Sequence, residues 1–269
     1  MASIQADFTV ADDILQEAAS QRLTGHGPIA INRSGRIGPL IELAMAATQF
    51  SEQYHLVTIN SRFSADLTEA MRSRQPFGSR LNDHAGVFPL GRDNPIIAAA
   101  TRWDQWTLHA ENVAKGKGLN PHLIAALMGA MVELQDNIYE HSGAPETGMV
   151  AYAVTRRSFE FVVADRGVGV LRTLHQNPRY ADIADAGVAL QEMIKDGVSR
   201  FPSEMGRGQG FSQLFRALVG HNAELRFRSG DHALTMRPTT DPLHGETAVA
   251  HVAPLDGLAI SVFYRTEAH

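Results

Sequence analysis

The chain has 269 residues, which is long for one compact domain and sufficient for two. Its formal net charge of −5 argues against a nucleic-acid partner, because no basic surplus is present to neutralise phosphates. The absence of cysteine excludes disulfides, thiolate metal sites and a cysteine nucleophile. The longest apolar stretch, 123–132, is well short of a membrane span. We therefore expect a cytoplasmic protein with no membrane partner.

Residues 1–95 are predicted to form a small α/β domain. Helices are expected at 14–25, 39–50 and 65–72, and strands at 28–32 and 55–60. Strands separated by helices are typical of parallel neighbours in one sheet. Residues 73–95 are rich in proline and glycine and contain few periodic apolar positions, so the domain junction is placed there.

Residues 96–269 are predicted to form a second domain, an α+β sandwich. A helix is expected from Asn120-Pro121 to His141, because a capping residue and a proline precede apolar positions at steps of three and four. The other expected elements are a strand and a helix within 96–118, a hairpin at 149–157 and 159–164, helices at 184–197 and 211–219, and strands at 224–228, 233–237 and 258–264. This order favours an antiparallel sheet with helices on one face. The segment 239–254 receives no assignment.

A carboxylate and an amide lie four residues apart on the helix that is predicted to end at His141. Glu133 and Asn137 therefore share one helix face, opposite the apolar face. An amide oxygen can bind a hard cation such as Mg²⁺, and a carboxylate can polarise a water molecule. Taken alone, such a pair is more often an ordinary solvated face. His141, near the helix end, is expected to be structural.

Asp165 follows the apolar strand predicted at 159–164 and precedes Gly167 and Gly169. An aspartate at a strand end can accept a hydrogen bond from an adenine amino group. Glycines allow the backbone to approach a ligand closely. Taken alone, the motif is more often an ordinary turn after a strand.

Three alternating glycines, Gly206, Gly208 and Gly210, immediately precede the helix predicted at 211–219. Backbone N–H groups of such a loop can bind phosphates at a helix amino terminus. The loop is not a Walker A motif, because no Gly-Lys-Ser/Thr follows, and it lacks the preceding strand of a Rossmann fingerprint. A glycine-rich loop alone is a weak signal.

The three motifs occur in one order, each on its expected element. Together, residues 121–265 resemble the GHKL superfamily of Bergerat-fold ATP-binding domains, which includes DNA gyrase B, the MutL proteins, histidine kinases and anti-sigma-factor serine kinases. The resemblance implies that ATP and Mg²⁺ are the cofactors. It also implies that residues 171–205 form a lid over the nucleotide.

The roles of the site residues follow from the resemblance. Glu133 would be the general base, and Asn137 would hold the Mg²⁺ that bridges the phosphates. Asp165 would recognise adenine, while Gly167 and Gly169 would shape the adenine pocket. The glycines that would face the phosphates are Gly206, Gly208 and Gly210.

Within the superfamily, the chain is most similar to bacterial anti-sigma and regulatory ATPases. The helix ending from Asn137 to Ser142 and the run from Lys195 to Ser199 carry this similarity. Many members have Gly-Thr before the last strand, where this chain has Gly257-Leu258, so one pocket hydroxyl is missing. No upstream helix pair with a phosphoacceptor histidine is evident, and autophosphorylation on histidine is not expected.

The amino-terminal part loosely resembles a STAS domain, the fold of anti-anti-sigma factors, through its order of strand, helix, strand and helix. STAS phosphoacceptors are Ser or Thr at the start of the first helix, where this chain has Ile37-Gly38-Pro39. The resemblance therefore implies a degenerate regulatory or docking domain without a phosphorylation site.

Two functions follow from these resemblances. One is a Mg²⁺-ATP-dependent ATPase or serine/threonine kinase in bacterial signalling, which acts on a sigma-factor regulator or another signalling protein and uses Glu133 as its base. The other is a regulatory module that controls a partner through its lid conformation, with or without bound nucleotide, which the loss of a hydroxyl at Leu258 favours. Both functions are compatible with a homodimer.

Overall fold

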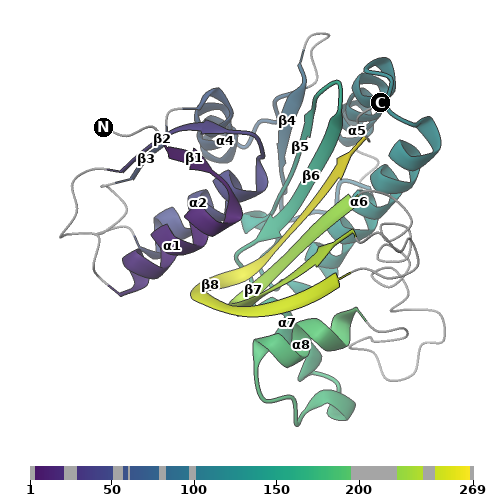
Figure 1. Ribbon diagram of the computed structural model, residues 1–269. Coiled ribbons are helices and arrows are strands. Elements are labelled where there is room, and N and C mark those ends of the chain that lie inside the picture. Colours follow the sequence, from purple (N-terminus) through teal and green to yellow (C-terminus); the bar gives the residue numbers. More distant parts are fainter. Residues whose placement is uncertain are drawn as a thin grey trace.

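The computed structural model describes residues 4–20, 29–50, 57–59, 61–78, 83–96, 101–194, 223–238 and 246–266. Within these ranges the fold is mixed α/β, with a three-stranded sheet and a five-stranded antiparallel sheet. The large sheet lies between a layer of amino-terminal elements and a layer of later helices (Figure 1). No helix in these ranges combines the length and the apolar character that crossing a bilayer requires.

The small sheet is parallel and alternates with helices, as predicted. Its elements are β1 (Ile4–Ala6), α1 (Phe8–Ala19), β2 (Ile29–Ser34), α2 (Gly38–Gln49), β3 (Val57–Ile59) and α4 (Arg62–Ser73), with strand order β1-β2-β3. The start predicted for the first helix, residue 14, is wrong. The side chain of Asp7 accepts a hydrogen bond from the Val10 N–H at 2.9 Å, so this cap starts the helix a turn and a half earlier.

The large sheet has the strand order β4-β5-β6-β8-β7. Its strands are β4 (Ala85–Pro89), β5 (Met149–Val154), β6 (Ser158–Asp165), β7 (Ala223–Arg237) and β8 (Glu246–Arg265). The antiparallel β5–β6 pair confirms the predicted hairpin. Strand β4 lies in the stretch 73–95, where the domain junction is predicted, and it pairs with β5, so the large sheet begins within that stretch.

Strands β7 and β8 are longer than the sequence pattern suggests. The two strands predicted at 224–228 and 233–237 form one strand, and residues 246–254 of the unassigned segment belong to β8. The pairing register shifts between Ser229 and His232 around Gly230. This irregularity breaks the period-two alternation, and the sequence therefore resembles a turn where the chain continues as a strand.

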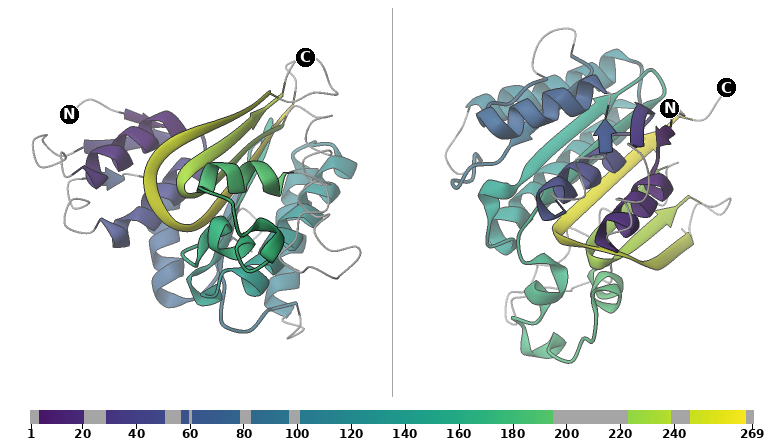
Figure 2. Two further views of the ribbon diagram at one scale, coloured as in Figure 1. Left: turned by 90° about the horizontal axis from the view of Figure 1, so that it is seen from below. Right: turned by 90° about the vertical axis from the view of Figure 1, so that its left-hand side faces the viewer.

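Helices α5 (Thr101–Gly116) and α6 (Pro121–His141) cover one face of the large sheet (Figure 2). The capping role predicted for Asn120 is confirmed, because its side chain accepts hydrogen bonds from the first N–H groups of α6. Trp103 and Trp106 of α5 are buried, and Trp106 contacts Tyr152 with ring centroids 5.1 Å apart. Both indole rings therefore belong to the core beneath α5 and α6.

Shorter elements follow at the end of α6. They are the 3-10 turns η2 (Pro145–Thr147) and η3 (Pro178–Tyr180) and the helices α7 (Gly169–Leu174) and α8 (Ala186–Met193). The described part of the helix predicted at 184–197 is α8. The helix predicted at 211–219 lies outside the described residues.

The opposite face of the large sheet packs against α1 and α2. Along β6, Phe159 and Phe161 join the core beneath α5 and α6, while Val162 and Ala164 join the core beneath α1 and α2. Because both faces are covered, β6 is buried almost throughout. The amino-terminal layer is thus part of the same packed body as the large sheet.

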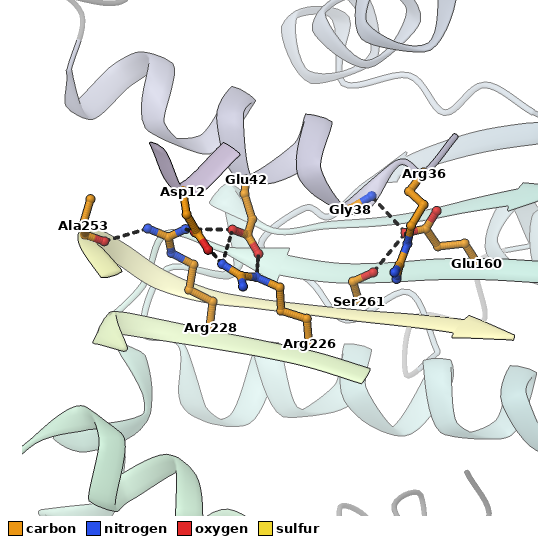
Figure 3. Close-up of polar contacts among 9 residues, drawn as sticks. All are labelled: Asp12, Arg36, Gly38, Glu42, Glu160, Arg226, Arg228, Ala253 and Ser261. Carbon is orange, nitrogen blue, oxygen red and sulfur yellow. Dashed lines mark hydrogen bonds and ion pairs between the residues drawn. The ribbon is translucent and has the colours of Figure 1, made fainter. Parts of the chain in front are cut away.

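Four charged side chains meet between this layer and the sheet, of which Glu42, Arg226 and Arg228 are buried and Asp12 is partly buried (Figure 3). Glu42 of α2 accepts hydrogen bonds from Arg226 and Arg228 of β7, both at 2.8 Å, and Asp12 of α1 accepts from the same two guanidinium groups at 2.6 and 2.8 Å. Arg228 also donates to the Ala253 carbonyl oxygen at 2.6 Å. We call Asp12, Glu42, Arg226 and Arg228 the buried charge cluster.

A second polar contact joins β6 to the start of α2. The carboxylate of Glu160 accepts hydrogen bonds from the N–H groups of Ile37 and Gly38 at 2.7 and 3.1 Å, and from the Ser261 hydroxyl at 3.0 Å. Arg36 pairs with the same carboxylate at 3.3 Å. The amino terminus of α2 has no cap from its own segment, so this distant glutamate satisfies it.

Candidate functional site

A small pocket opens where α6 and β6 both end. Its walls come from α6, the start of α7, α8, and strands β7 and β8. The lining residues are Asn137, His141, Ser142, Asp165, Gly169, Val170, Thr173, Met193, Phe227 and Leu258. The cavity measures about 40 Å³, which is room for water but not for a nucleobase.

Asp165 is the acidic group of this pocket. It is the last residue of β6, it is only 3% exposed, and it lies opposite Leu258 in the pairing with β8. Burial raises the pKa of the Asp165 carboxyl to about 6, even though a hydrogen bond from the Gly167 N–H lowers it. A buried carboxylate with a raised pKa in a largely apolar pocket is typical of a ligand-binding group.

The loop after Asp165 is held on several sides. The Gly167 N–H donates to Asp165 Oδ1 at 2.7 Å, and the Val168 N–H donates to the Ser142 carbonyl oxygen at 2.8 Å. On the other side, the Val170 N–H donates to the hydroxyl of Ser229 at 3.0 Å. These bonds fix the turn that leads from β6 into α7.

Both predicted loop glycines are required by this geometry. A Cβ at Gly167 would lie 2.1 Å from the Ser142 carbonyl oxygen, and Gly169 has a φ of +73°. Gly169 lines the pocket, whereas Gly167 does not line it but donates a hydrogen bond to Asp165. The turn between β6 and α7 therefore needs glycine at both positions.

The α6 wall of the pocket contains Asn137 and, one turn later, His141. The structure thus brings Asn137 and Asp165 to one pocket although they are distant in sequence. Glu133 lies one turn before Asn137 on the same helix, but it is exposed and does not line the pocket. His141, for which a structural role is expected, also lines the pocket.

The third predicted motif, Gly206, Gly208 and Gly210, lies outside the described residues. The same holds for the part of the predicted lid, 171–205, that follows residue 194. Several of the lining residues belong to no recognisable sequence motif. Thr173, Met193 and Phe227 occupy ordinary helix or strand positions. Only their place in the fold brings them to the pocket.

Asp165 should make stability depend on pH. Because its folded-state pKa of about 6 exceeds the ordinary value of 3.8, its contribution is fully present below pH 3.8 and is lost as the pH rises through 6. Between pH 4 and pH 7, wild type should lose about 2 kcal/mol of unfolding free energy relative to Asp165→Asn. Urea denaturation of both proteins at the two pH values measures this difference. If the unfolding free energies of the two proteins changed equally with pH, Asp165 would not be a buried carboxyl with a raised pKa.

Adding one methyl group at Gly167 should disturb the turn. Gly167→Ala should lower the unfolding free energy by roughly 1–3 kcal/mol, because the Cβ would overlap the backbone of Ser142. Gly129→Ala is the matched control, since a Cβ at this exposed position on α6 meets no atom within 4 Å. The control should be neutral or stabilising by about 1 kcal/mol. Equal stability of the two variants would show that the turn adapts.

Within the described ranges, no group of three or more His, Asp or Glu side chains could hold a metal ion by itself. No protein-family model matches the chain, and no curated protein sequence matches it significantly.

Proposed function

We propose that the chain binds Mg²⁺-ATP in this pocket in the manner of a Bergerat-type ATP-binding domain, and that the amino-terminal layer is a STAS-like unit. The observation that carries the proposal is that the buried Asp165 and Asn137 line the same pocket. These residues belong to the first two motifs that resemble the GHKL superfamily, and they meet in space. Bacterial signalling in the cytoplasm, through a protein partner, is the setting that the resemblance favours.

Asp165 suits the recognition of adenine. One of its two carboxylate oxygens accepts the Gly167 N–H, and the second would accept the amino group of the base. Phe227, Leu258 and Met193 supply apolar contacts for a flat ring. Because the cavity is smaller than a nucleobase, a side chain must shift on binding, and the unbranched Met193 is well suited to do so.

Asn137 suits the Mg²⁺ that accompanies the phosphates. A single protein amide oxygen, together with phosphate oxygens and water, is an ordinary ligand set for this ion. When bound, ATP would supply the transferable phosphoryl group.

Two details favour the alternative of a nucleotide-dependent regulatory module that does not turn over ATP. Glu133, the candidate base, is exposed and lies outside the pocket. Leu258 lines the pocket where a threonine hydroxyl is common in the superfamily. Binding is therefore the core of the proposal, and phosphoryl transfer to Ser or Thr of a partner is its extension.

Calorimetric titration of ATP with Mg²⁺ and with a chelator tests the proposal. Asn137→Ala should weaken binding roughly tenfold or more with Mg²⁺, because it removes a ligand to a charged group, and should leave binding in the chelator unchanged. Failure of folded wild type to bind ATP in either condition would overturn the proposal.

Glu133→Gln separates catalysis from binding. Its ATP affinity should stay within about twofold of wild type, while any ATP turnover should fall by roughly 100-fold or more if Glu133 is the base. Glu111→Gln on α5 is the matched control, because it removes a carboxylate remote from the pocket. Wild-type binding without turnover, with or without candidate partners, would favour the regulatory module.

A further inference from the structure

A second and much larger cavity lies between the amino-terminal layer and the large sheet. Its volume is about 800 Å³, and it shares no lining residue with the pocket at Asp165. The residues that matter for its chemistry are Arg36, Ser61, Arg62, Asp66, Phe77 and Asp83. We call it the interlayer pocket. Its size is within the range of small-molecule binding sites.

The interlayer pocket occupies a position where parallel sheets commonly bind ligands. Gly35 and Arg36 follow the carboxyl end of β2, and Ser61 and Arg62 follow the carboxyl end of β3. Because β2 and β3 are parallel, both loops open at the same edge of the small sheet. Ligands of open α/β sheets bind in the crevice outside the carboxyl ends of the strands.

The far wall of the interlayer pocket comes from the large sheet. Asp83 and Ala85 precede or begin β4, and Ala153 and Thr155 lie at the end of β5. The cavity is therefore bordered by elements of two different sheets, which the buried charge cluster and the Glu160 contacts hold together. A site between two fixed layers is preorganised for binding.

Charged side chains of both signs line the interlayer pocket. They are Arg36, Arg62, Asp66 and Asp83, of which Arg36 already pairs with Glu160 and Glu224. Arg62 is 93% exposed and pairs only loosely with Asp66, at 3.7 Å, so a ligand can replace this ion pair at little cost. The two carboxylates oppose a phosphate dianion, while the mixture of signs suits a molecule that carries both charges.

Part of the lining of the interlayer pocket is apolar. Ile37 and Leu40 of the α2 segment and the Phe63–Phe77 pair, whose ring centroids are 6.3 Å apart, line it. Phe63 and Phe77 are only half-buried, so a ligand would remove further apolar surface from water. A ligand with a negative group, a positive group and an apolar side chain would match the arginines, the aspartates and the apolar part of the lining.

We propose that the interlayer pocket binds a small zwitterion with an apolar side chain, of the amino-acid class. The carboxylate of the ligand lies toward Arg62 and the amino end of α4, and its ammonium group lies toward Asp66. The side chain contacts Phe63 and Phe77. The pocket is independent of the proposed nucleotide site, so either proposal can fail without the other.

Titration of ¹⁵N-labelled protein with L-phenylalanine, followed by two-dimensional NMR, tests the proposal. Amide signals of Ser61, Arg62 and Phe77 should shift, and those of Gly169 and Thr173 in the other pocket should not. Asp66→Asn should weaken L-phenylalanine binding roughly fivefold, the upper range for one exposed ion pair. N-acetyl-L-phenylalanine, which lacks the ammonium group, should bind wild type and Asp66→Asn with equal affinity.

Matched controls separate this result from a general charge effect. Asp104→Asn removes an exposed carboxylate on α5 outside the interlayer pocket and should leave L-phenylalanine binding unchanged. Arg62→Gln should weaken L-phenylalanine but not L-phenylalaninamide, which lacks the carboxylate. Absence of shifts at millimolar L-phenylalanine, or stronger shifts with inorganic phosphate at the same residues, would overturn the proposal.

Discussion

Asp165→Asn should lower the affinity for ATP by about 100-fold, the largest effect that we expect from one pocket substitution. The aspartate offers two oxygens, one for the Gly167 N–H and one for the amino group of adenine. Asparagine offers only one, so one of the two donors loses its acceptor in a buried place. Calorimetric titration near pH 7.5, where the carboxyl of wild type is ionised, measures the loss.

The origin of this loss can be isolated with a nucleotide that lacks the amino group. Wild type should bind purine riboside triphosphate with lower affinity than ATP. Asp165→Asn should bind the two nucleotides with about equal affinity. Asp104→Asn serves as the control for removal of one negative charge, since Asp104 is exposed on α5. If the amino group contributes equally in wild type and Asp165→Asn, this carboxylate does not recognise adenine.

Glu42→Gln should lower the unfolding free energy by about 3–5 kcal/mol, because it leaves two buried guanidinium groups with one carboxylate fewer. Glu42 is 2% exposed and accepts from both Arg226 and Arg228. Urea denaturation at pH 7 measures the change. The size of the effect reflects the cost of unpaired buried charge rather than the strength of one ion pair.

Glu69→Gln is the matched control for Glu42→Gln. Glu69 also accepts two hydrogen bonds from an arginine, Arg72 at 3.0 and 2.8 Å, but this pair is exposed on α4. Its loss should cost no more than about 0.5–1 kcal/mol. Similar costs for the two variants would mean that water reaches the buried charge cluster.

Acid should remove the contribution of Glu42 to the free energy of unfolding. Burial alone would raise the pKa of Glu42, but attraction to Arg226 and Arg228 outweighs it and lowers the pKa below the ordinary 4.5. The contribution of Glu42 is therefore present above pH 4.5 and is lost as the pH falls through the folded-state pKa. The pKa of Asp12 is shifted in the opposite direction, because burial raises it more than attraction to Arg226 lowers it.

Local rules predicted much of the fold. The alternation of strands and helices before residue 73, the β5–β6 hairpin and the capped helix α6 follow from periodicity and capping residues. The sequence did not predict β4, because its five residues lie in a proline- and glycine-rich stretch and become a strand only by pairing with β5. The continuity of β7 past Gly230 likewise depends on its partner β8.

The site was predictable to the extent that its residues belong to short motifs. Asp165, Gly169 and Asn137 were all identified from spacing and do line one pocket. Glu133 was paired with Asn137 by helix geometry, yet one helical turn is enough to place it outside the pocket. The residues that cover the apolar walls, such as Phe227 and Met193, depend on tertiary packing that spacing cannot predict.

The buried charge cluster also bears on how the chain folds as a ribosome synthesises it. Glu42 and Arg226 are separated by 184 positions, and Asp12 and Arg228 by 216. The two carboxylates therefore emerge long before their cationic partners exist, and the face of α1 and α2 that contains them must stay hydrated until β7 has been made. Such late, long-range pairing slows folding and prolongs exposure of unfinished surfaces. Nascent chains that stop before β7 should accordingly be substrates for chaperones rather than compact intermediates.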